Sequence, residues 1–278
     1  MISKLLSIIE SKRKNKNYIW RFIVWIKDKV WGIAKRCYTE YVFFVSWLSA
    51  ENFKNKPIEK FYKISFCITC MNRSGHIKKT LLKNILNNID YPDVEFVLLD
   101  YNSKDDLEQW VKSNLNDYIK SGVLKYFQTK EPKYFHVSKA KNMAHRFATG
   151  NIVCNLDADN YTGKDFAYLV NYVLNKMPKS IGSCMEFNYN EKFFDNFGIG
   201  GRIFLFKKYF DLIGGYNESF EGWNYEDRDF VNRAKKVGLN NYSIPLHYLR
   251  TIKHDDKIRL ENYDPEAVKS SPLGSRIS

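Results

Sequence analysis

The sequence predicts an α/β protein with one mostly parallel sheet and helices on both faces of that sheet. Short apolar runs alternate with segments of helical periodicity from Phe61 onward, which is the pattern of consecutive strand–helix units. The run VEFVLLD, at 94–100, is almost continuously apolar, as expected of a parallel strand covered on both sides. Polar residues follow several predicted strands, and open α/β sheets bind ligands at the rim formed by the carboxyl ends of their strands.

The first half of this domain is regular enough for its elements to be predicted in order. The apolar run KISFCITC, at 63–70, is a first strand, and the segment 76–89 places Ile77, Leu81 and Ile85 on one helical face. A turn at Pro92 leads to the strand 94–100, a helix at 107–119 and a short strand at 123–128. A helix at 137–148 ends before Gly150, a residue type that commonly stops helices, and an apolar strand at 152–156 follows.

The second half is less regular. A helix is predicted at 166–175, a strand at 181–189, and a second strand at 203–206 after the glycine-rich stretch NFGIGG. The chain breaks at Gly214 and Gly215, a helix runs from Glu226 through Val237, and a last short strand covers 243–248. We therefore expect one domain at 61–262, followed by a loose polar tail at 263–278.

Residues 1–60 differ from the rest in charge and in aromatic content. They hold 13 Lys and Arg against 5 acidic residues, so they contribute +8 of the net charge of +13, and they include Trp20, Trp25, Trp31 and Trp47. Apolar residues at helical spacing between positions 18 and 35 predict a basic amphipathic helix. Such a helix either packs on the main domain or docks reversibly on an anionic membrane, where each basic residue near the surface contributes about 1 kcal/mol.

Composition narrows the class of partner and the compartment. A net charge of +13 favours an anionic partner, which could be a nucleic acid, a phosphorylated small molecule or a membrane surface. The five cysteines are scattered, and Cys67 and Cys70 face opposite sides of a predicted strand, so we expect reduced thiols. No secretory signal and no apolar run of bilayer length is visible. We expect a cytoplasmic protein, peripheral at the inner face of the cell membrane.

Two aspartates end the predicted strand at 152–156. Like charges as close as Asp157 and Asp159 raise each other's pKa unless something positive lies between them. A hard divalent cation with oxygen ligands fits that arrangement. Asn72 and Arg73 follow the first strand and Asp100 ends the second, so these side chains are expected at the same rim. The alternatives are a turn with two solvated aspartates and, for Asp100, a helix-capping or turn role.

A second cluster of acids begins the helix at 226. Glu226, Asp227 and Asp229 lie in its first turn, where the helix dipole stabilises negative charge, but the dipole does not explain the preceding Gly222-Trp223. His247 and His254 follow the helix, and one of the two could complete a metal site begun by a pair of aspartates.

These segments together resemble the GT-A glycosyltransferases, which have a Rossmann-like fold. The resemblance covers about 63–262 and is carried by VSKAKNMAHRFATGNIVCNLDAD, by IGGYNESFEGWNYEDRDF and by a later histidine. It is closest to inverting, family-2-like enzymes with a galactosyltransferase-type C-terminal motif. It implies a hexosyltransferase that moves a sugar from a nucleotide sugar, most often a UDP-sugar, to a hydroxyl of a glycan or lipid-linked acceptor, as in polysaccharide biosynthesis.

The resemblance also implies a role for each candidate residue. Asp157 and Asp159 would hold Mn²⁺ or Mg²⁺ on the donor diphosphate, with His254 as a further ligand and His247 as second choice. Asp227 would be the catalytic base, with Glu226 beside it. The residues implied to contact the nucleotide sugar are Asn72, Arg73, Asp100, Lys139, Lys141, Asp157 and Trp223. Those implied on the acceptor side are Trp223, which would form a shelf with Gly222, and Arg228 and Asp229.

The sequence departs from the family pattern at two places, and three other interpretations of its function remain. Arg228 stands where the family often has a third acid, and Asn224 and Tyr225 replace glycine-rich positions, so the acceptor cannot be carried over from the family. A retaining transferase of the same fold is the nearest alternative. A nucleotidyltransferase would also pair two aspartates on a metal ion. A non-enzymatic membrane or nucleic-acid binder would explain the charge but not the acids. The glycosyltransferase interpretation predicts no nucleic-acid partner.

Overall fold

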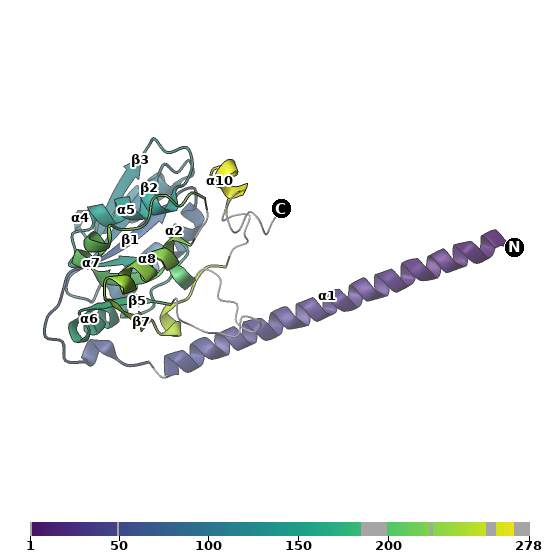
Figure 1. Ribbon diagram of the computed structural model, residues 1–278, viewed down its shortest axis with the longest axis horizontal. Helices are drawn as coiled ribbons and strands as arrows, with labels where there is room; N and C mark the ends of the chain where they lie inside the picture. Colours follow the sequence, from purple (N-terminus) through teal and green to yellow (C-terminus); the bar gives the residue numbers. More distant parts are fainter. Residues whose placement is uncertain (1, 49, 185–198, 223–224, 254–259, 270–278) are drawn as a thin grey trace. The chain divides into compact units, whose positions relative to one another are not determined.

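The computed structural model describes residues 2–48, 50–184, 199–222, 225–253 and 260–269. The chain divides into two compact units, of which the first contains the helix α1 (Ile2–Leu48) and the second contains every strand of the described residues (Figure 1). The strands are β1 (Ile64–Cys70), β2 (Val94–Tyr101), β3 (Leu124–Thr129), β4 (Ile152–Asn155), β5 (Ser180–Ser183), β6 (Ile203–Phe206) and β7 (Asn240–Ser243). The helices of the second unit are α2 (Ser74–Asn88), α3 (Leu107–Asn114), α4 (Asn116–Lys120), α5 (Val137–Phe147), α6 (Phe166–Lys176), α7 (Lys207–Ile213), α8 (Glu226–Lys236) and α10 (Pro265–Lys269).

The seven strands form one sheet in the order β3-β2-β1-β4-β6-β5-β7. β1 pairs in parallel with β2 and β4, β2 with β3, and β5 with β7, whereas β6 runs antiparallel to β4 and β5. The predicted mostly parallel sheet is confirmed. Because β1, β2 and β4 are parallel neighbours, the loops after Cys70, Tyr101 and Asn155 leave the sheet at the same rim.

Helices cover both faces of the sheet, as predicted. On one face, Cys67 and Val97 join a buried cluster with Ala140 and Ala144 of α5 and Phe230 of α8. On the other face the aromatic ring of Phe66 stacks on Phe96 and lies 6.2 Å from the ring of Phe166 in α6. Successive strand residues point to opposite sides, so an unbroken apolar strand supplies both layers. Figure 1 shows α5, α7 and α8 gathered along the sheet.

Most element predictions are confirmed within a residue or two, and three details differ. The predicted helix at 107–119 is two helices, α3 and α4, which meet at Leu115. The helix α7, directly after β6, is not predicted. The predicted last strand at 243–248 is wrong, because β7 ends at Ser243 and a short 3-10 helix occupies Leu246–Tyr248. Pro245 precedes that helix and cannot donate a ladder hydrogen bond. Of the strand predicted at 181–189, positions 185–189 lie outside the described residues.

The helix predicted near the N-terminus lies within α1. Its apolar side chains include a row along one side of the helix, at spacings of three, four or eight residues, all 41–65% exposed: Ile26, Val30, Ile33, Tyr41, Phe44 and Leu48. In the described part of the chain no helix combines the length and the apolar content that a membrane crossing needs. At the other end, the start of the predicted loose tail is ordered, because Tyr263 is buried and its ring meets Phe135 edge-on at 5.6 Å.

Candidate active site

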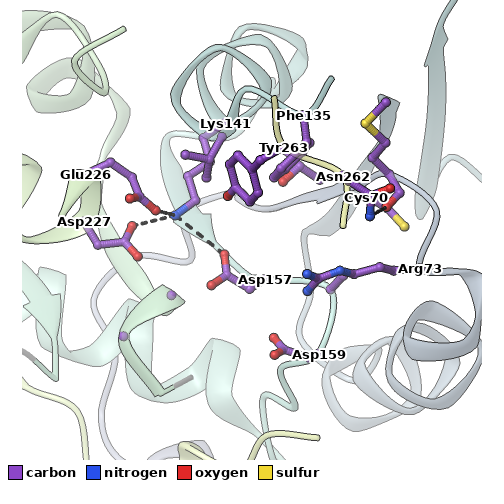
Figure 2. Close-up of a pocket in the computed structure, with 16 residues that line it drawn as sticks. Cys70, Arg73, Phe135, Lys141, Asp157, Asp159, Glu226, Asp227, Asn262 and Tyr263 are labelled. Atoms are coloured by element: carbon purple, nitrogen blue, oxygen red, sulfur yellow. Dashed lines mark hydrogen bonds and ion pairs between the residues drawn. The ribbon is translucent and has the colours of Figure 1, made fainter. Parts of the chain in front are cut away.

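A cavity of about 230 Å³ opens at the rim where the carboxyl ends of β1 and β4 lie side by side (Figure 2). Its wall includes the loop after β1, the turn after β4, the first turn of α8 and the start of α5, together with the residues at 200–201 and 262–263. The lining residues are Thr69, Cys70, Met71, Arg73, Phe135, Val137, Lys141, Asp157, Ala158, Asp159, Gly200, Gly201, Glu226, Asp227, Asn262 and Tyr263. The two predicted acid clusters, which are about 70 residues apart in sequence, therefore face one cavity.

Asp157 is fixed from three sides. Its Oδ1 accepts a hydrogen bond from Asn155 Nδ2 at 3.2 Å and lies 3.7 Å from Lys141 Nζ. Its Oδ2 lies against the backbone of Gly201, where a Cβ atom would be only 1.9 Å from that oxygen. Asn155 Nδ2 also donates to the carbonyl of Gly201 at 2.7 Å, which ties the segment before β6 to this aspartate. A glycine at 201 is thus required by the position of the Asp157 carboxylate.

Asp159 lies deeper than Asp157, and its residue is only 7% exposed. Its Oδ1 accepts a hydrogen bond from Asn160 Nδ2 at 2.7 Å, and its carbonyl accepts one from Ile252 N at 2.8 Å. The amide of Asn160 donates back to the carbonyl of Asp157 at 2.9 Å, so the two aspartates belong to one tight turn. Both carboxylates line the cavity, as the sequence predicts.

The acid pair at the start of α8 surrounds a buried lysine of α5. Lys141 Nζ donates to Asp227 Oδ1 at 2.7 Å and to Glu226 Oε1 at 3.0 Å, and Figure 2 shows this amine between the pair and Asp157. Burial raises the pKa of Asp227 to about 7, although the charge of Lys141 opposes that shift. Burial alone would lower the pKa of Lys141, but Asp157, Asp227 and Glu226 together raise it well above its ordinary value. Lys141 is therefore an ammonium ion at neutral pH.

The predicted donor contacts at the ends of β1 and β2 divide into two groups. Arg73 lines the cavity. Asn72, with a left-handed φ of 53°, uses its side chain within the protein, donating to Asn262 Oδ1 at 2.7 Å and accepting from Lys104 N at 2.6 Å. Asp100 is fully buried and is not among the described residues that line the cavity; its carboxylate accepts from Tyr126 Oη at 2.7 Å. Asp100 Oδ1 also accepts from Ser103 N at 2.7 Å, which is the turn role that the sequence left open for this residue.

The remaining predicted residues lie around the cavity or outside the described part of the chain. Lys139 is exposed on α5. The guanidinium of Arg228 lies 5.3 Å from the ring centre of Tyr225, and Asp229 pairs with Arg233 at 2.7 Å. None of these three side chains lines the cavity as far as the described residues define it. Trp223 and His254 fall outside the described residues, and within those residues no group of three or more His, Cys, Asp or Glu is placed to hold a metal ion.

Several lining residues were not predicted, because their positions depend on the folded chain. The carbonyl of Asn262 accepts from Phe135 N at 2.6 Å, and its Nδ2 donates to the carbonyl of Met71 at 3.0 Å. Tyr263 follows and closes the cavity from the same side. The one sequence feature that could have indicated the segment 262–263 is an aromatic residue, Tyr263, at the start of an otherwise polar tail. No sequence feature indicated Phe135, because it lies in an irregular loop.

Comparisons with known proteins agree with this architecture. A profile of the family described as glycosyl transferase family 2 matches residues 65–220, which is more than half of the chain. The mannosyltransferase PcManGT from Pyrobaculum calidifontis, in complex with GDP-Man and Mn²⁺, is 19% identical with a TM-score of 0.54, over 78% of this chain and 66% of that one. No curated protein sequence matches the chain.

Two further solved structures have similar folds. GalNAc-T7, with UDP, GalNAc and Mn²⁺, is 15% identical with a TM-score of 0.54, over 67% of this chain and 43% of that one. A fragment of S. aureus TarS in complex with UDP-GlcNAc is 15% identical with a TM-score of 0.56, over 75% of this chain and 65% of that one. The chain thus spans less than two thirds of each of these three structures. At these identities they show a shared GT-A fold, and the family profile shows that the chain belongs to glycosyl transferase family 2.

Proposed function

We propose that the protein is a metal-dependent, inverting glycosyltransferase that moves a sugar from a nucleotide sugar to a hydroxyl of a glycan or lipid-linked acceptor. One observation carries the proposal: Asp157, Asp159 and Asp227 face a single cavity of about 230 Å³. Membership of family 2 supports the reaction class. Nucleotide sugars or their parts are bound in the similar structures of PcManGT, GalNAc-T7 and TarS, which supports a donor of that kind. The motif resemblance favours a UDP-sugar.

The carboxylates of Asp157 and Asp159 are the groups that would hold Mn²⁺ or Mg²⁺, with His254 as the proposed further ligand. Two carboxylates in one turn offer the oxygen donors that these hard cations prefer, and Gly201 leaves the space beside Asp157 Oδ2 that a side chain would fill. A bound ion would neutralise the charge that develops on a leaving diphosphate. Arg73, on the same wall, is the proposed further contact for the phosphates.

Asp227 is the proposed base. It is held across the cavity from the loop after β1, and its ionised form can take the proton of an attacking hydroxyl. A hydroxyl activated from the side opposite the diphosphate displaces it with inversion of the anomeric carbon. Trp223, Arg228 and Asp229 are proposed for the acceptor side. Arg228 and Asp229 lie in the first turn of α8 beside Asp227, although neither is among the described residues that line the cavity.

The test is nucleotide release from a panel of UDP- and GDP-sugars, measured with Mn²⁺ and again with EDTA. We expect Mn²⁺-dependent release of one nucleoside diphosphate, lost in Asp157→Asn and kept in Asp117→Asn, an exposed aspartate on α4. NMR of the transferred sugar then distinguishes inversion from retention. Release of pyrophosphate from a nucleoside triphosphate, or no metal-dependent release from any sugar donor, would overturn the proposal.

We also propose that α1 binds an anionic membrane surface, which would place the enzyme at the inner face of the cell membrane. The exposed apolar row from Ile26 to Leu48 lies on one side of α1, while Lys35 lies opposite and Arg36 on the flank. Basic charge complements anionic headgroups, while exposed Trp25, Trp31 and Trp47 suit the interface between headgroups and acyl chains. All five cysteines are free thiols, which supports a reducing compartment.

A further inference from the structure

Lys141 is the one lysine that is buried among the residues the structure describes, with its side chain 2% exposed. It projects from α5 toward two other segments, the first turn of α8 and the turn after β4. An ammonium group has three donors and accepts nothing. Here two of them form hydrogen bonds to Glu226 and Asp227, and Asp157 Oδ1 lies 3.7 Å away in the third direction shown in Figure 2.

The amine is enclosed on its remaining side by an aromatic ring. Lys141 Nζ lies 5.1 Å from the ring centre of Tyr216, a residue that is itself buried. Two donors are hydrogen-bonded to carboxylates, the third side faces Asp157 and a ring lies behind, so the amine would have to give up one of these contacts to bind a phosphate of the nucleotide. The resemblance implied a nucleotide contact for this residue, and the geometry points to a different role.

We propose that Lys141 is a positioning residue, which holds the carboxylate of Asp227 in place and joins it to the donor-side Asp157 around one buried ammonium. The inference rests on the proposed function, because it assigns Asp227 the part of the base. It makes α5 the element that sets the relative position of the donor side and the acceptor side of the cavity.

The charges around Asp227 show why such a residue is needed. Glu226 beside it on α8 and Asp157 after β4 both disfavour its ionised form, and Lys141 is the opposing positive charge. Among the described residues, Tyr216 and Cys184 also interact with it; burial is the main cause that raises the pKa of each, so both are neutral at pH 7. Burial keeps the pKa of Asp227 near 7 even with Lys141 present. Removing the ammonium removes this opposing positive charge, which disfavours the ionised carboxylate that a base needs.

The first experiment compares Lys141→Met with Lys79→Met, a control that removes one positive charge from the exposed side of α2. In Lys141→Met we expect the acid limb of the kcat/KM profile to move up by more than one pH unit. Turnover at pH 7 should fall at least tenfold, and the Kd for UDP in the presence of Mn²⁺ should stay within threefold of the wild-type value. Lys79→Met should match the wild type in all three. An unchanged acid limb together with a tenfold weaker UDP affinity would overturn the proposal and restore the nucleotide contact.

A second measurement needs no activity, so it separates failure of this inference from failure of the proposed function. Thermal unfolding at pH 8 is compared for the wild type, Lys141→Met, Asp227→Asn and the double variant. Lys141 faces three carboxylates, so Lys141→Met leaves these acids crowded without a positive charge and should have the lowest Tm, and the added Asp227→Asn removes one of the acids and should raise it again. If the two substitutions change Tm additively, Lys141 does not hold Asp227, whether or not a sugar donor is found.

Discussion

Asp227 is a carboxylate whose surroundings work against its charge. Its side chain is 16% exposed, and its pKa of about 7 is caused first by burial and then by the nearby Glu226 and Asp157, with Lys141 opposing them. A base with a pKa near the working pH combines a large ionised fraction with good proton affinity. The first turn of α8 therefore has the electrostatics that proton removal from a hydroxyl requires.

The pH dependence of turnover follows from this environment. Because only ionised Asp227 can accept a proton, we expect kcat/KM to fall about tenfold for each pH unit below about 7, and Asp227→Asn to lose at least a hundredfold in kcat. Steady-state rates between pH 5 and 9, taken with saturating Mn²⁺, check both. A flat profile down to pH 5 would show that another group takes the proton.

The same pKa makes Asp227 a source of instability at high pH. The folded state binds this proton more tightly than the unfolded chain, whose value is the ordinary 3.8, so the cost of ionisation appears above pH 4 and is complete above about 7. We expect Asp227→Asn to have a higher Tm than the wild type at pH 8 and the same Tm near pH 4. A lower Tm for the variant at pH 8 would contradict this account of burial.

Gly201 tests the placement of Asp157. A Cβ atom at this position would lie 1.9 Å from Asp157 Oδ2, so Gly201→Ala must displace that carboxylate. We expect the Mn²⁺ concentration for half-maximal activity to rise at least tenfold while circular dichroism stays unchanged. The control is Gly75→Ala at the start of α2, where a Cβ meets nothing within 4 Å. Wild-type metal dependence in Gly201→Ala would remove Asp157 from the metal site.

At the residue scale, the sequence identified the two acid clusters because each is a short local motif. Asp157 and Asp159 follow a strand, and Glu226 and Asp227 begin a helix, and both positions can be recognised without knowing the fold. What surrounds these acids could not be predicted. The ion pairs of Lys141, the contact with Gly201 and the closure by Asn262 and Tyr263 all join segments that are distant in the sequence. Tertiary packing alone brings them together.

At the scale of elements, the strands that are buried on both faces were the most predictable. β1, β2 and β6 are mostly apolar and almost fully buried, and they lie where the sequence places them. β7 was missed because its residues, Asn240, Asn241, Tyr242 and Ser243, are not typical of a strand, and the parallel pairing with β5 stabilises them. The break between α3 and α4 at Leu115 could not be predicted, because no proline or glycine lies there.

At the end of the sheet away from the cavity, where β1 and β2 begin, one buried carboxylate of β2 stabilises the fold. Glu95 is 1% exposed; burial would raise its pKa, but hydrogen bonds from Lys125, Ser65 and Thr149 lower it to about 2. These bonds join β1, β2, β3 and the turn before β4. We expect Glu95→Gln to lower the free energy of unfolding at pH 7 by about 3 kcal/mol, as for a broken buried pair. Urea unfolding measures this.

The sign of the pH effect at Glu95 is opposite to that at Asp227. Its depressed pKa gives stability that is fully present above the ordinary value of 4.5 and is lost as the pH falls toward 2. The difference in unfolding free energy between the wild type and Glu95→Gln should therefore shrink between pH 4.5 and 2. UDP affinity should be unchanged, because Glu95 does not line the cavity as described. A constant difference across that pH range would contradict the account.

At the scale of the whole molecule, the proposed role of α1 is to bind an anionic membrane, which the chemistry at the cavity does not require. We expect the protein to float with vesicles containing anionic phospholipid, not with neutral ones, and to be released by high salt. Lys35→Glu/Arg36→Glu and Trp25→Ser/Trp31→Ser should each weaken flotation at least fivefold and leave nucleotide release in solution unchanged. Association of the protein with itself through the apolar row, without binding to vesicles, would show that a second copy covers this face.

The proposed transfer depends on a divalent cation bound by the two aspartates after β4, opposite the acid at 227. The most direct measurement is a crystal structure with Mn²⁺ and UDP, with the metal located by its anomalous signal. The account predicts a single peak within coordination distance of Asp157 and Asp159 carboxylate oxygens, bridging to the diphosphate, with Asp227 facing it across the cavity. A peak elsewhere, with both aspartates turned away from the ion, would contradict it.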